Sequence, residues 1–542
     1  MWPRLLRFIR GSPGKSALAA LLLLAVAALV CADALLAGPI RIWGEQKINA
    51  NLKGYTVRIA RARPRIYKLA LALDGLVLTQ NRHPDPPVAD FAALEFTLQW
   101  SQLMHFKVAA ELTLIRPALH LNLAQIQEEA ASKVSLKDQG WQAAVESIYP
   151  FKLDQVRIQD GSMLYLAAAP TSKPIQLTSM AMLAKNISNK ASAQGTYPSP
   201  VTFQAALFDT GKVWFKGAAD FLREPYSAAM GEIRLDRVPL DRLGPLAKDY
   251  NLRTTGGLLS AKGTLEYTPK TQKAHLTEVQ FEDLRVDYVT STATKAQEEA
   301  HAKQALQLAK DVRNSPQVVV QVDSLRLSHS QIGFIDEAAK PPYRLFMSDV
   351  SLKLTNLSNQ ANQGRSEFHA QGAFMGSGKT MLSGGFLPTA KPANFAIQLR
   401  LEDAKLTDLN KFLLAHTGVD VADGLFSVYT ELTVKGGRVE GYLKPLVKNL
   451  KVSDKQKDKA KSFGKRVEMH VLQGLANLFK NRSTRQLATV TRISGPTSDP
   501  KASEWEVIRR LIGNGFARAI RPGFMGPAEE RKPAPPVPPG DR

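Results

Sequence analysis

Cysteine and any grouping of catalytic or metal-binding side chains are almost absent from this chain. The single cysteine among 542 residues is Cys31. It lies inside an apolar run, so an internal disulfide is excluded and the rest of the chain has no thiol nucleophile. The nine histidines stand singly, without an H-x-x-x-H or H-E-x-x-H pair, and no G-x-S-x-G motif occurs. We therefore expect no metal, no cofactor and no catalytic residue, and we predict that the protein is not an enzyme.

One glycine-rich segment resembles the end of a phosphate-binding loop. Gly376–Thr380 reads GSGKT, but the motif G-x-x-x-x-G-K-[ST] requires glycine at position 373, where the chain has Ala373. Strand-like residues also lie on both sides, whereas a phosphate-binding loop opens a helix. We predict a hairpin turn here.

The longest apolar run is Ser16–Leu36, in which Asp33 is the only charged residue. As a helix it would extend roughly 31 Å, close to the roughly 30 Å hydrocarbon core of a bilayer. The first fifteen residues contain no acid and four bases, namely Arg4, Arg7, Arg10 and Lys15. The positive-inside rule then predicts a cytoplasmic N-terminus (1–15), a single-pass anchor (16–36) and an exported remainder.

Two alternatives to a retained anchor remain open. The same pattern fits a cleaved signal peptide, with Ala32–Asp33–Ala34 as an A-x-A site. A lipoprotein signal is less favoured, because Leu29–Val30 precede Cys31 where a small residue is usual.

The chain is strongly basic, with a formal net charge of +22. In a cytosolic protein this charge would suggest nucleic acid. Outside the inner membrane the available polyanions are lipid headgroups and lipopolysaccharide phosphates, so we expect no nucleic-acid partner. A well-solvated basic surface is the plain alternative.

Residues after the apolar run alternate between apolar and polar with the period of β-strands. A short helix is expected over Ile42–Asn51, with Trp43 at an interfacial height, followed by strands such as Tyr55–Ile59. Asp74–Gly75 is predicted to be a hairpin turn between two further strands. We assign 40–124 to an N-terminal β unit and 125–150 to a helical joint.

Two later parts of the chain resemble each other. Lys152–Tyr165 aligns with Gln321–Phe334, and Gly257–Ser260 aligns with Gly424–Ser427. Islands in one order at nearly constant offset predict duplication of a module of roughly 165 residues. We place the modules at 151–290 and 316–450, with a helical insertion at 291–315.

The C-terminal part has a different composition. Residues 451–482 carry nine Lys or Arg against three acids, and Val467, Val471, Leu475 and Leu478 recur at helical spacing. We predict a basic and amphipathic helical region at 451–520 and a Pro-rich disordered tail at 521–542.

The apolar side of the repeated strands must be covered, either as an ordinary core or as a trough that holds acyl chains. Alternation by itself does not separate these two cases. The candidate groove residues alternate over several strands of both modules; they are Val156, Ile158, Leu325, Leu327, Val350, Leu352, Leu354, Phe395, Ile397, Leu399, Phe426 and Val428.

Several segments resemble the AsmA-like envelope proteins, in particular their branch called domain of unknown function 748. They are the N-terminal anchor, Leu52–Ile59, Leu78–Val88, Ile115–Asn122, Gly140–Trp141 before Tyr149–Pro150, and Leu153–Gly161. The resemblance implies a bacterial inner-membrane protein whose periplasmic part is an elongated, curved antiparallel β groove. Larger relatives are thought to carry phospholipid across the periplasm or to support outer-membrane assembly. This chain is short for a complete bridge, so a partner is expected.

These observations favour a non-enzymatic protein that binds or transfers phospholipid or another envelope lipid. The basic helix would meet anionic headgroups through Lys457, Lys461, Lys465 and Arg466. One alternative is an assembly scaffold that binds envelope proteins, for example by strand addition at an open sheet edge. An envelope hydrolase is the least favoured alternative, because no nucleophile and base are visible together.

Overall fold

The computed structural model describes the strands and several turns of the chain. The described residues are 33–50, 52, 54–99, 110–122, 153–166, 174–187, 197–221, 228–243, 251–268, 270–291, 313–418, 420–452, 486–488 and 490–497. Several predicted segments lie wholly outside the described residues: the basic N-terminus, the helical joint, the Pro-rich tail and the four headgroup residues. Most of the predicted anchor and most of the helical insertion also lie outside them.

Two compact units make up the chain. Unit 1 comprises residues 1–286, 298–330 and 355–363, and unit 2 comprises 287–297, 331–354 and 364–542. Both are mainly β, as predicted. β13 (Arg285–Thr290), β14 (Val318–Asp336) and β15 (Tyr343–Ser358) contribute residues to each unit.

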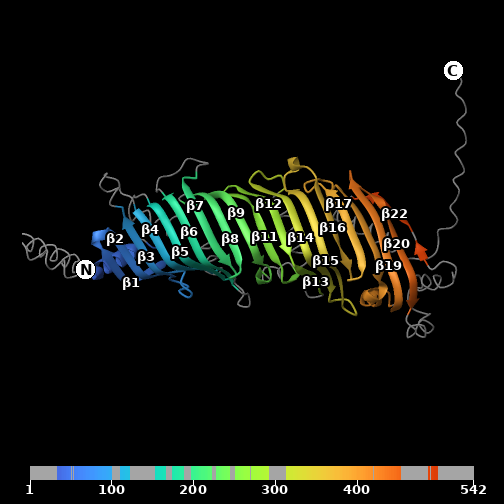
Figure 1. Ribbon diagram of the computed structural model, residues 1–542, viewed down its shortest axis with the longest axis horizontal. Helices are drawn as coiled ribbons and strands as arrows, with labels where there is room; N and C mark the ends of the chain where they lie inside the picture. The colour runs from blue at the N-terminus through green and yellow to red at the C-terminus, as the bar shows by residue number, and fades with distance from the viewer. Residues whose placement is uncertain are drawn as a thin grey trace, which may run out of the picture. The chain divides into compact units, whose positions relative to one another are not determined.

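Unit 1 is built on a mixed sheet whose neighbouring strands are visible side by side in Figure 1. Its elements are β1 (Tyr55–Arg65), η1 (Ile66–Lys68), β2 (Ala70–Gln80), β3 (Ala89–Leu98), β4 (Ala110–Asn122), β5 (Leu153–Leu166), β6 (Ile175–Ile187), β7 (Ser199–Leu207), β8 (Gly211–Asp220), β9 (Ala228–Pro239), η2 (Asp241–Leu243), β10 (Leu252–Thr255), β11 (Leu258–Tyr267), β12 (Gln272–Glu282) and η3 (Ala361–Gln363). Antiparallel pairs connect β1 to β4, β5 to β9, β9 to β11 and β11 to β12. The pairs β4–β5 and β12–β14 are parallel, so the sheet is mixed and the expectation of an antiparallel sheet is wrong at these two pairs.

Unit 2 contains a run of antiparallel strands and one short helix. Its elements are β16 (Ser366–Phe374), β17 (Gly378–Phe386), β18 (Phe395–Lys405), η4 (Leu406–Leu409), α9 (Asn410–Thr417), β19 (Val421–Lys435), β20 (Arg438–Val452), β21 (Gln486–Ala488) and β22 (Thr491–Pro496). Pairs join β16 to β17, β18, β19 and β20 in turn, and β20 also pairs with β21 and β22. Gly376 and Ser377 form the turn between β16 and β17, which confirms the hairpin predicted there.

Backbone irregularities recur at matching places of the two aligned modules, which supports the predicted duplication. Residues in the left-handed region lie within strands, at strand ends and in turns, and such residues return 166 to 170 positions later. The matching pairs are Asp160 and His329, Ser179 and Asp349, Asn186 and Asn356, Phe208 and Met375, Arg237 and Asp403, Gly257 and Gly424, and Asp283 and Asn449. The bulge in β9–β11 also returns in β18–β19.

Two expectations about local structure are wrong. Asp74–Gly75 is not a hairpin turn: β2 continues through it in unbroken register with β1. Gly75 takes φ 58° close to the Ala60 side chain, and Asp74 binds Arg63 across β1–β2. Within 451–520, residues 486–488 and 491–496 form strands β21 and β22 instead of helix, and the helical spacing from Val467 to Leu478 lies outside the described residues. Pairing with β20 satisfies backbone groups there, and Ile493 is only 3% exposed.

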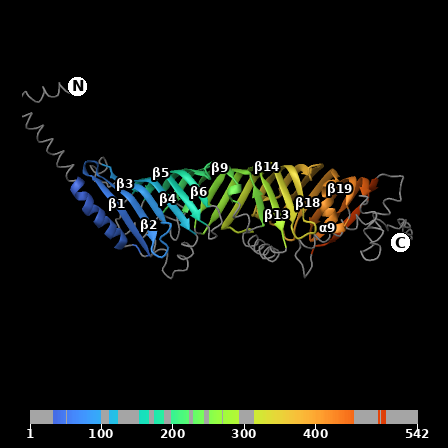
Figure 2. The same cartoon turned by 90° about the horizontal axis from the view of Figure 1, so that it is seen from below.

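A helix over residues 33–50 lies along the outer edge of β1 (Figure 2), so the predicted helix over 42–51 is present and begins earlier. The Asn49 side chain donates to Val57 O at 2.8 Å and accepts from Val57 N at 2.7 Å. Glu45 accepts from Ile59 N at 3.2 Å, and Asp33 accepts from Ile66 N at 3.1 Å. Side chains of the helix thus occupy backbone groups of an edge strand that could otherwise pair with another chain.

The substitution Asn49→Ala tests this edge protection. It removes both hydrogen bonds to Val57, and such bonds contribute about 0.5–1.5 kcal/mol each. We expect the Val57 amide to exchange its hydrogen roughly tenfold faster, measured by hydrogen–deuterium exchange on the full chain. Gln46→Ala, on the exposed side of the same helix, should leave the exchange rate unchanged. Equal rates in Asn49→Ala and the unmodified protein would contradict the role of Asn49.

Candidate functional site

Cross-strand neighbours in unit 1 form an unbroken row of uncharged, almost entirely apolar residues from β1 to β14. We call it the first apolar row; its members, in the order of pairing, are Ala62, Leu73, Leu94, Leu114, Ile158, Met182, Phe203, Phe215, Ile233, Gly263, Leu276 and Val322. Directly opposed residues have Cβ atoms about 4.5–5.5 Å apart, so their side chains are neighbours on one face. The row therefore crosses the whole sheet of unit 1 without a charge.

A second row runs beside the first, two residues along each strand. The second apolar row consists of Pro64, Leu71, Phe96, Leu112, Val156, Ala184, Val201, Gly217, Gly231, Leu265, Ala274 and Val320. Residues two apart on a strand share a face, so the two rows form one continuous surface. We call this surface the apolar face of unit 1.

The opposite face carries polar side chains. The row between the two apolar rows consists of Arg63, Ala72, Glu95, Thr113, Arg157, Leu183, Thr202, Lys216, Glu232, Thr264, His275 and Gln321. Only Ala72 and Leu183 in this row are apolar. The sheet of unit 1 is thus amphipathic, with one face suited to water and the other to apolar groups.

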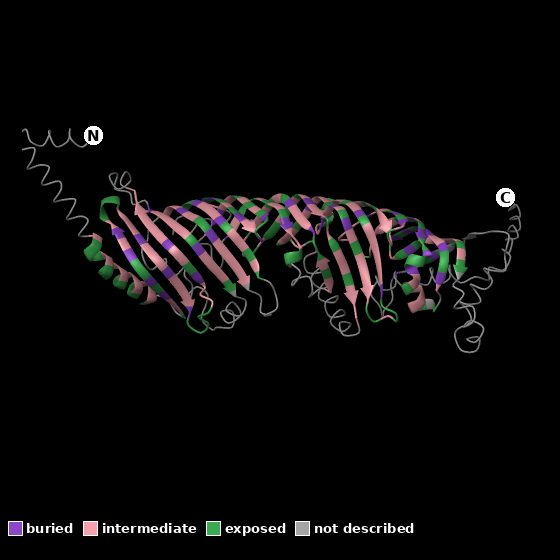
Figure 3. Ribbon diagram, turned by 60° about the horizontal axis from the view of Figure 1, so that its bottom comes forward, coloured by how far each residue is buried: buried purple, intermediate pink, exposed green. Residues whose placement is uncertain are grey.

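Most members of the apolar face are half-buried. Figure 3 shows the intermediate class over most of the strands, with buried residues interspersed. Val156 and Val201 are 9% and 7% exposed, whereas Ile158, Phe203, Phe215 and Ile233 keep intermediate exposure. Apolar area left in contact with water costs about 25 cal/mol per Å². The face is therefore suited to an apolar ligand or partner.

Two glycines, Gly217 and Gly231, face each other in the second apolar row where β8 pairs with β9. A Cβ on Gly217 would lie 2.1 Å from the Met230 carbonyl oxygen, and one on Gly231 would lie 2.9 Å from the Phe215 ring. No side chain fits at either position, and the Phe215 ring lies beside Gly231 in place of one. The two backbones consequently approach closely at this point of the second apolar row.

In unit 2 part of the corresponding surface is packed, whereas the predicted groove residues Leu352, Leu354, Phe395, Ile397, Leu399 and Phe426 keep intermediate exposure. Leu401, Val428, Leu432, Val434 and Leu443 form a core in which no member exceeds 7% exposure. Leu406 and Leu409 of η4 pack with Leu413 of α9 against Phe426. Two hydrogen bonds between Asn410 and Val421, of 2.8 and 2.9 Å, hold the start of α9 on the sheet.

The predicted groove residues fall into two sets. Val156, Ile158, Leu325 and Leu327 lie in unit 1, where Val156 and Ile158 belong to the apolar face and Leu325 packs against the cluster around Val322. Val350, Leu352, Leu354, Phe395, Ile397, Leu399, Phe426 and Val428 lie in unit 2. Leu327, Val350 and Val428 are 6%, 1% and 7% exposed, so these three are core residues.

Sequence reasoning missed the residues that continue the apolar face between the modules' ends. Met182, Phe203, Phe215 and Ile233 carry it through β6 to β9. The alternation Val201–Phe203–Ala205 and the pair Val213–Phe215 were the available signals. They became meaningful only through the register, which places Phe203 and Phe215 in the row that contains Ile158.

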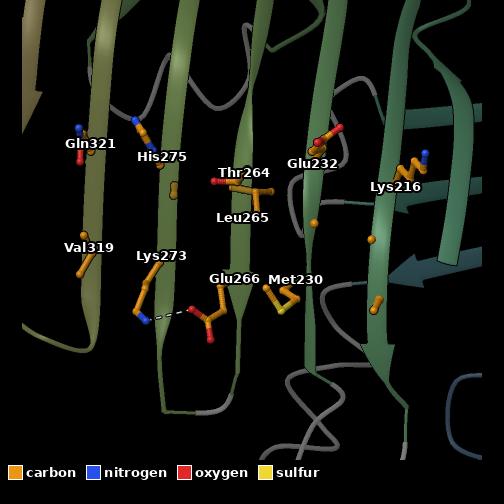
Figure 4. A pocket seen from close by; sticks show the side chains of 14 residues that line it. Lys216, Met230, Glu232, Thr264, Leu265, Glu266, Lys273, His275, Val319 and Gln321 are labelled. Atoms are coloured by element: carbon orange, nitrogen blue, oxygen red, sulfur yellow. Dashed lines mark hydrogen bonds and ion pairs between the residues drawn. The ribbon is translucent and has the colours of Figure 1, made fainter. Parts of the chain in front are cut away.

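A shallow hollow of about 640 Å³ lies on the polar face over β8, β9, β11, β12 and β14 (Figure 4). Lys216, Glu232, Thr264, His275 and Gln321 line it on one side, and Met230, Glu266, Lys273 and Val319 on the other. Lys273 Nζ lies 2.9 Å from Glu266 Oε2, and His275 Nε2 lies 2.9 Å from both Asp323 oxygens. The hollow is thus bordered by the Lys273–Glu266 ion pair and the His275–Asp323 hydrogen bond at an exposed surface.

The charge pair in this hollow shifts one pKa. The hydrogen bond from Lys273 lowers the pKa of the Glu266 carboxyl, and a second hydrogen bond from Tyr197 at 3.1 Å acts in the same direction. Burial opposes both effects. The hydrogen bonds from Lys273 and Tyr197 favour the charged form of the Glu266 carboxylate.

Within the described part of the chain, no three His, Cys, Asp or Glu side chains are grouped so that they could hold a metal ion. The described helices include none that is both long and apolar enough to cross a membrane. Only residues 33–36 of the predicted anchor are among them. Neither a scan against models of known protein families nor a search of curated proteins finds a match to this chain.

Gly217→Ala tests the close approach of β8 and β9. The added methyl would overlap the Met230 carbonyl, and overpacking of this kind costs about 1–3 kcal/mol. We expect a lower midpoint of denaturant unfolding. Gly44→Ala is the matched control, because a Cβ there has nothing within 4 Å and alanine favours the helix by about 1 kcal/mol. A Gly217→Ala protein as stable as the unmodified one would show that the strands can separate at no cost.

Lys273→Met tests the charge pair in the hollow. Because the Glu266 pKa is lowered in the folded state, the pair stabilises the fold at pH above the ordinary carboxyl pKa, and this contribution is lost as pH falls through the lowered value. The variant should raise the Glu266 pKa, measured by carbon NMR of labelled glutamate. Lys270→Met, in the same β11–β12 hairpin, should leave the Glu266 pKa in place. A Glu266 pKa that does not respond to Lys273→Met would disprove the assignment.

Proposed function

We propose that this chain is an AsmA-like, inner-membrane-anchored periplasmic protein that binds or transfers phospholipid along the apolar face of its β-sheet. The proposal joins the resemblance in the sequence to one structural observation, the two adjacent apolar rows that cross unit 1 without a charge. Acyl chains are long, flexible and apolar, so a continuous strip with no charged residue matches them better than a closed pocket would.

The chemistry of the two faces supports a lipid rather than a polar ligand. Half-buried leucine, isoleucine and phenylalanine side chains offer apolar area, while the polar face keeps the same sheet soluble. Burying an acyl chain releases about 0.8 kcal/mol per CH₂ group. A few methylene groups on the strip therefore suffice for useful affinity, without any specific hydrogen bond.

The groove is proposed to be elongated and curved, built from the repeated modules, and to contribute to outer-membrane biogenesis or homeostasis. The two charge-free rows support unit 1 as the main binding surface, since Val428 and its neighbours in unit 2 pack against one another. Candidate contacts in unit 1 are Ile158, Met182, Phe203, Phe215 and Ile233.

A photocrosslinking experiment on the full chain in cells tests the proposal. A benzophenone amino acid replaces Phe203 in one strain and Thr202 in another; the two residues are neighbours on β7 and point to opposite faces. With phosphate-labelled lipids, we expect irradiation to attach label to the protein at position 203 and not at 202. Label at both positions would indicate non-specific membrane proximity, and no label at 203 would contradict lipid binding and favour the scaffold function.

A variant that places a charge on the apolar face gives a second test of lipid binding. Ile233→Glu places a carboxylate in the first apolar row, on the strand beside Phe215. We expect it to reduce crosslinking at position 203, because a charge on the strip must be desolvated by the acyl chain. Arg234→Glu, on the opposite face of the same strand, should leave the crosslinking unchanged.

A further inference from the structure

Large apolar side chains are exposed together at the end of unit 1 where the sheet begins. On the helix over 33–50, Leu35 is 76% exposed, Leu36 42%, Ile42 48% and Trp43 60%. In the adjoining turn η1, Ile66 is 37% and Tyr67 57% exposed. A soluble protein rarely leaves such a group in water without a partner for it.

Asp33 joins the helix to this turn. Its carboxylate accepts a hydrogen bond of 3.1 Å from Ile66 N, so η1 lies beside the first turn of the described helix. Asp33 is also the single charged residue of the apolar run Ser16–Leu36. A charge at that position is explained if its role is to fix η1 at the end of the run.

The turn has the chemistry of a membrane interface. Tyr67 is an amphipathic aromatic of the kind enriched at headgroup level, and Trp43 is another. Lys68 Nζ lies 5.6 Å from the centre of the Tyr67 ring. Arg65 and Lys68 flank the turn, so its apolar tip is bordered by positive charge, which attracts anionic headgroups.

We propose that η1 and the outward side of the helix over 33–50 form a contact site for an anionic phospholipid membrane. Ile66 and Tyr67 enter the interface, and Lys68 remains among the headgroups. The inference rests on the membrane anchoring in the proposed function, and it does not depend on lipid binding by the apolar face.

The position of this site relative to the apolar rows has a functional consequence. The first row begins at Ala62 and Leu73 and the second at Pro64 and Leu71, all within a few residues of η1 on β1 and β2. A lipid that leaves the bilayer at this turn meets the beginning of the apolar face directly. The membrane contact would thus be the entry point of the strip.

A spin-label measurement on the full chain tests the contact. Tyr67→Cys carries a nitroxide in a background with Cys31→Ser, and the protein is reconstituted in vesicles of phosphatidylethanolamine and phosphatidylglycerol. Thr210→Cys is the control, because it lies in the exposed turn between β7 and β8 of the same unit. We expect the label at 67 to be reached by oxygen and shielded from a water-soluble nickel complex, and the label at 210 to show the reverse.

Two results would overturn the inference. Nickel access at 67 equal to that at 210 would place the turn in water, and loss of access to both reagents would place it under another protein. Lys68→Glu should move the label at 67 towards water, whereas Lys212→Glu should not. Because crosslinking at Phe203 is measured separately, loss of the turn's membrane contact with crosslinking retained would reject this inference alone, and the opposite result would reject only the lipid-binding strip.

Discussion

Strand register is the constraint on which the rest of this structure depends. Side chains alternate between faces, so a slip of one residue would move a strand's apolar residues to the polar side. The β-bulges fix the register and so keep the apolar residues of each strand on one face. Met182 pairs with Phe203, and Leu177 pairs with Leu207 on the same strand β7. Leu177 and Met182 are five residues apart and yet share a face, because the bulge around Ser179 absorbs one position.

The sheet of unit 1 has an open edge at β1 and an open apolar face, and only the edge is covered by the described residues. Asn49 and Glu45 of the helix over 33–50 accept hydrogen bonds from Val57 N and Ile59 N at the edge of β1, and Asp33 accepts from Ile66 N in the adjoining η1. These bonds replace the strand pairing that an exposed edge invites. The apolar face of unit 1, in contrast, is left half-exposed along its length, which is costly unless another molecule uses it.

Unit 2 shows what the same type of strand does when its face is used for packing. Val434 and Val439 have no exposed area, and Leu432 and Leu443 are 7% and 5% exposed. η4 and α9 add Leu406, Leu409 and Leu413 as a cover at one side. The repeated module is therefore compatible with both a packed core and an open strip, and side-chain size and local cover decide between them.

Much of the architecture could be predicted from the sequence, because strand alternation and internal similarity are local properties. The β class, the short helix before Tyr55 and the turn at Gly376 followed from patterns within a few residues. The continuation of β2 through Gly75 did not, because it depends on pairing with β1 and β3 on both sides and on the ion pair between Asp74 and Arg63. Strand β22 was also missed, since its short alternation around Ile493 gains meaning only beside β20.

The sequence by itself determined which residues are apolar, how they alternate and which segments resemble each other. Only the tertiary structure decided which of them meet. Ile158, Phe203 and Ile233 are far apart in the chain, and successive cross-strand pairs through Met182 and Phe215 place them in one row. Val350 and Val428 have the same alternating pattern and are buried instead. The physical reason is that alternation assigns a residue to a face, whereas register and packing determine what that face contacts.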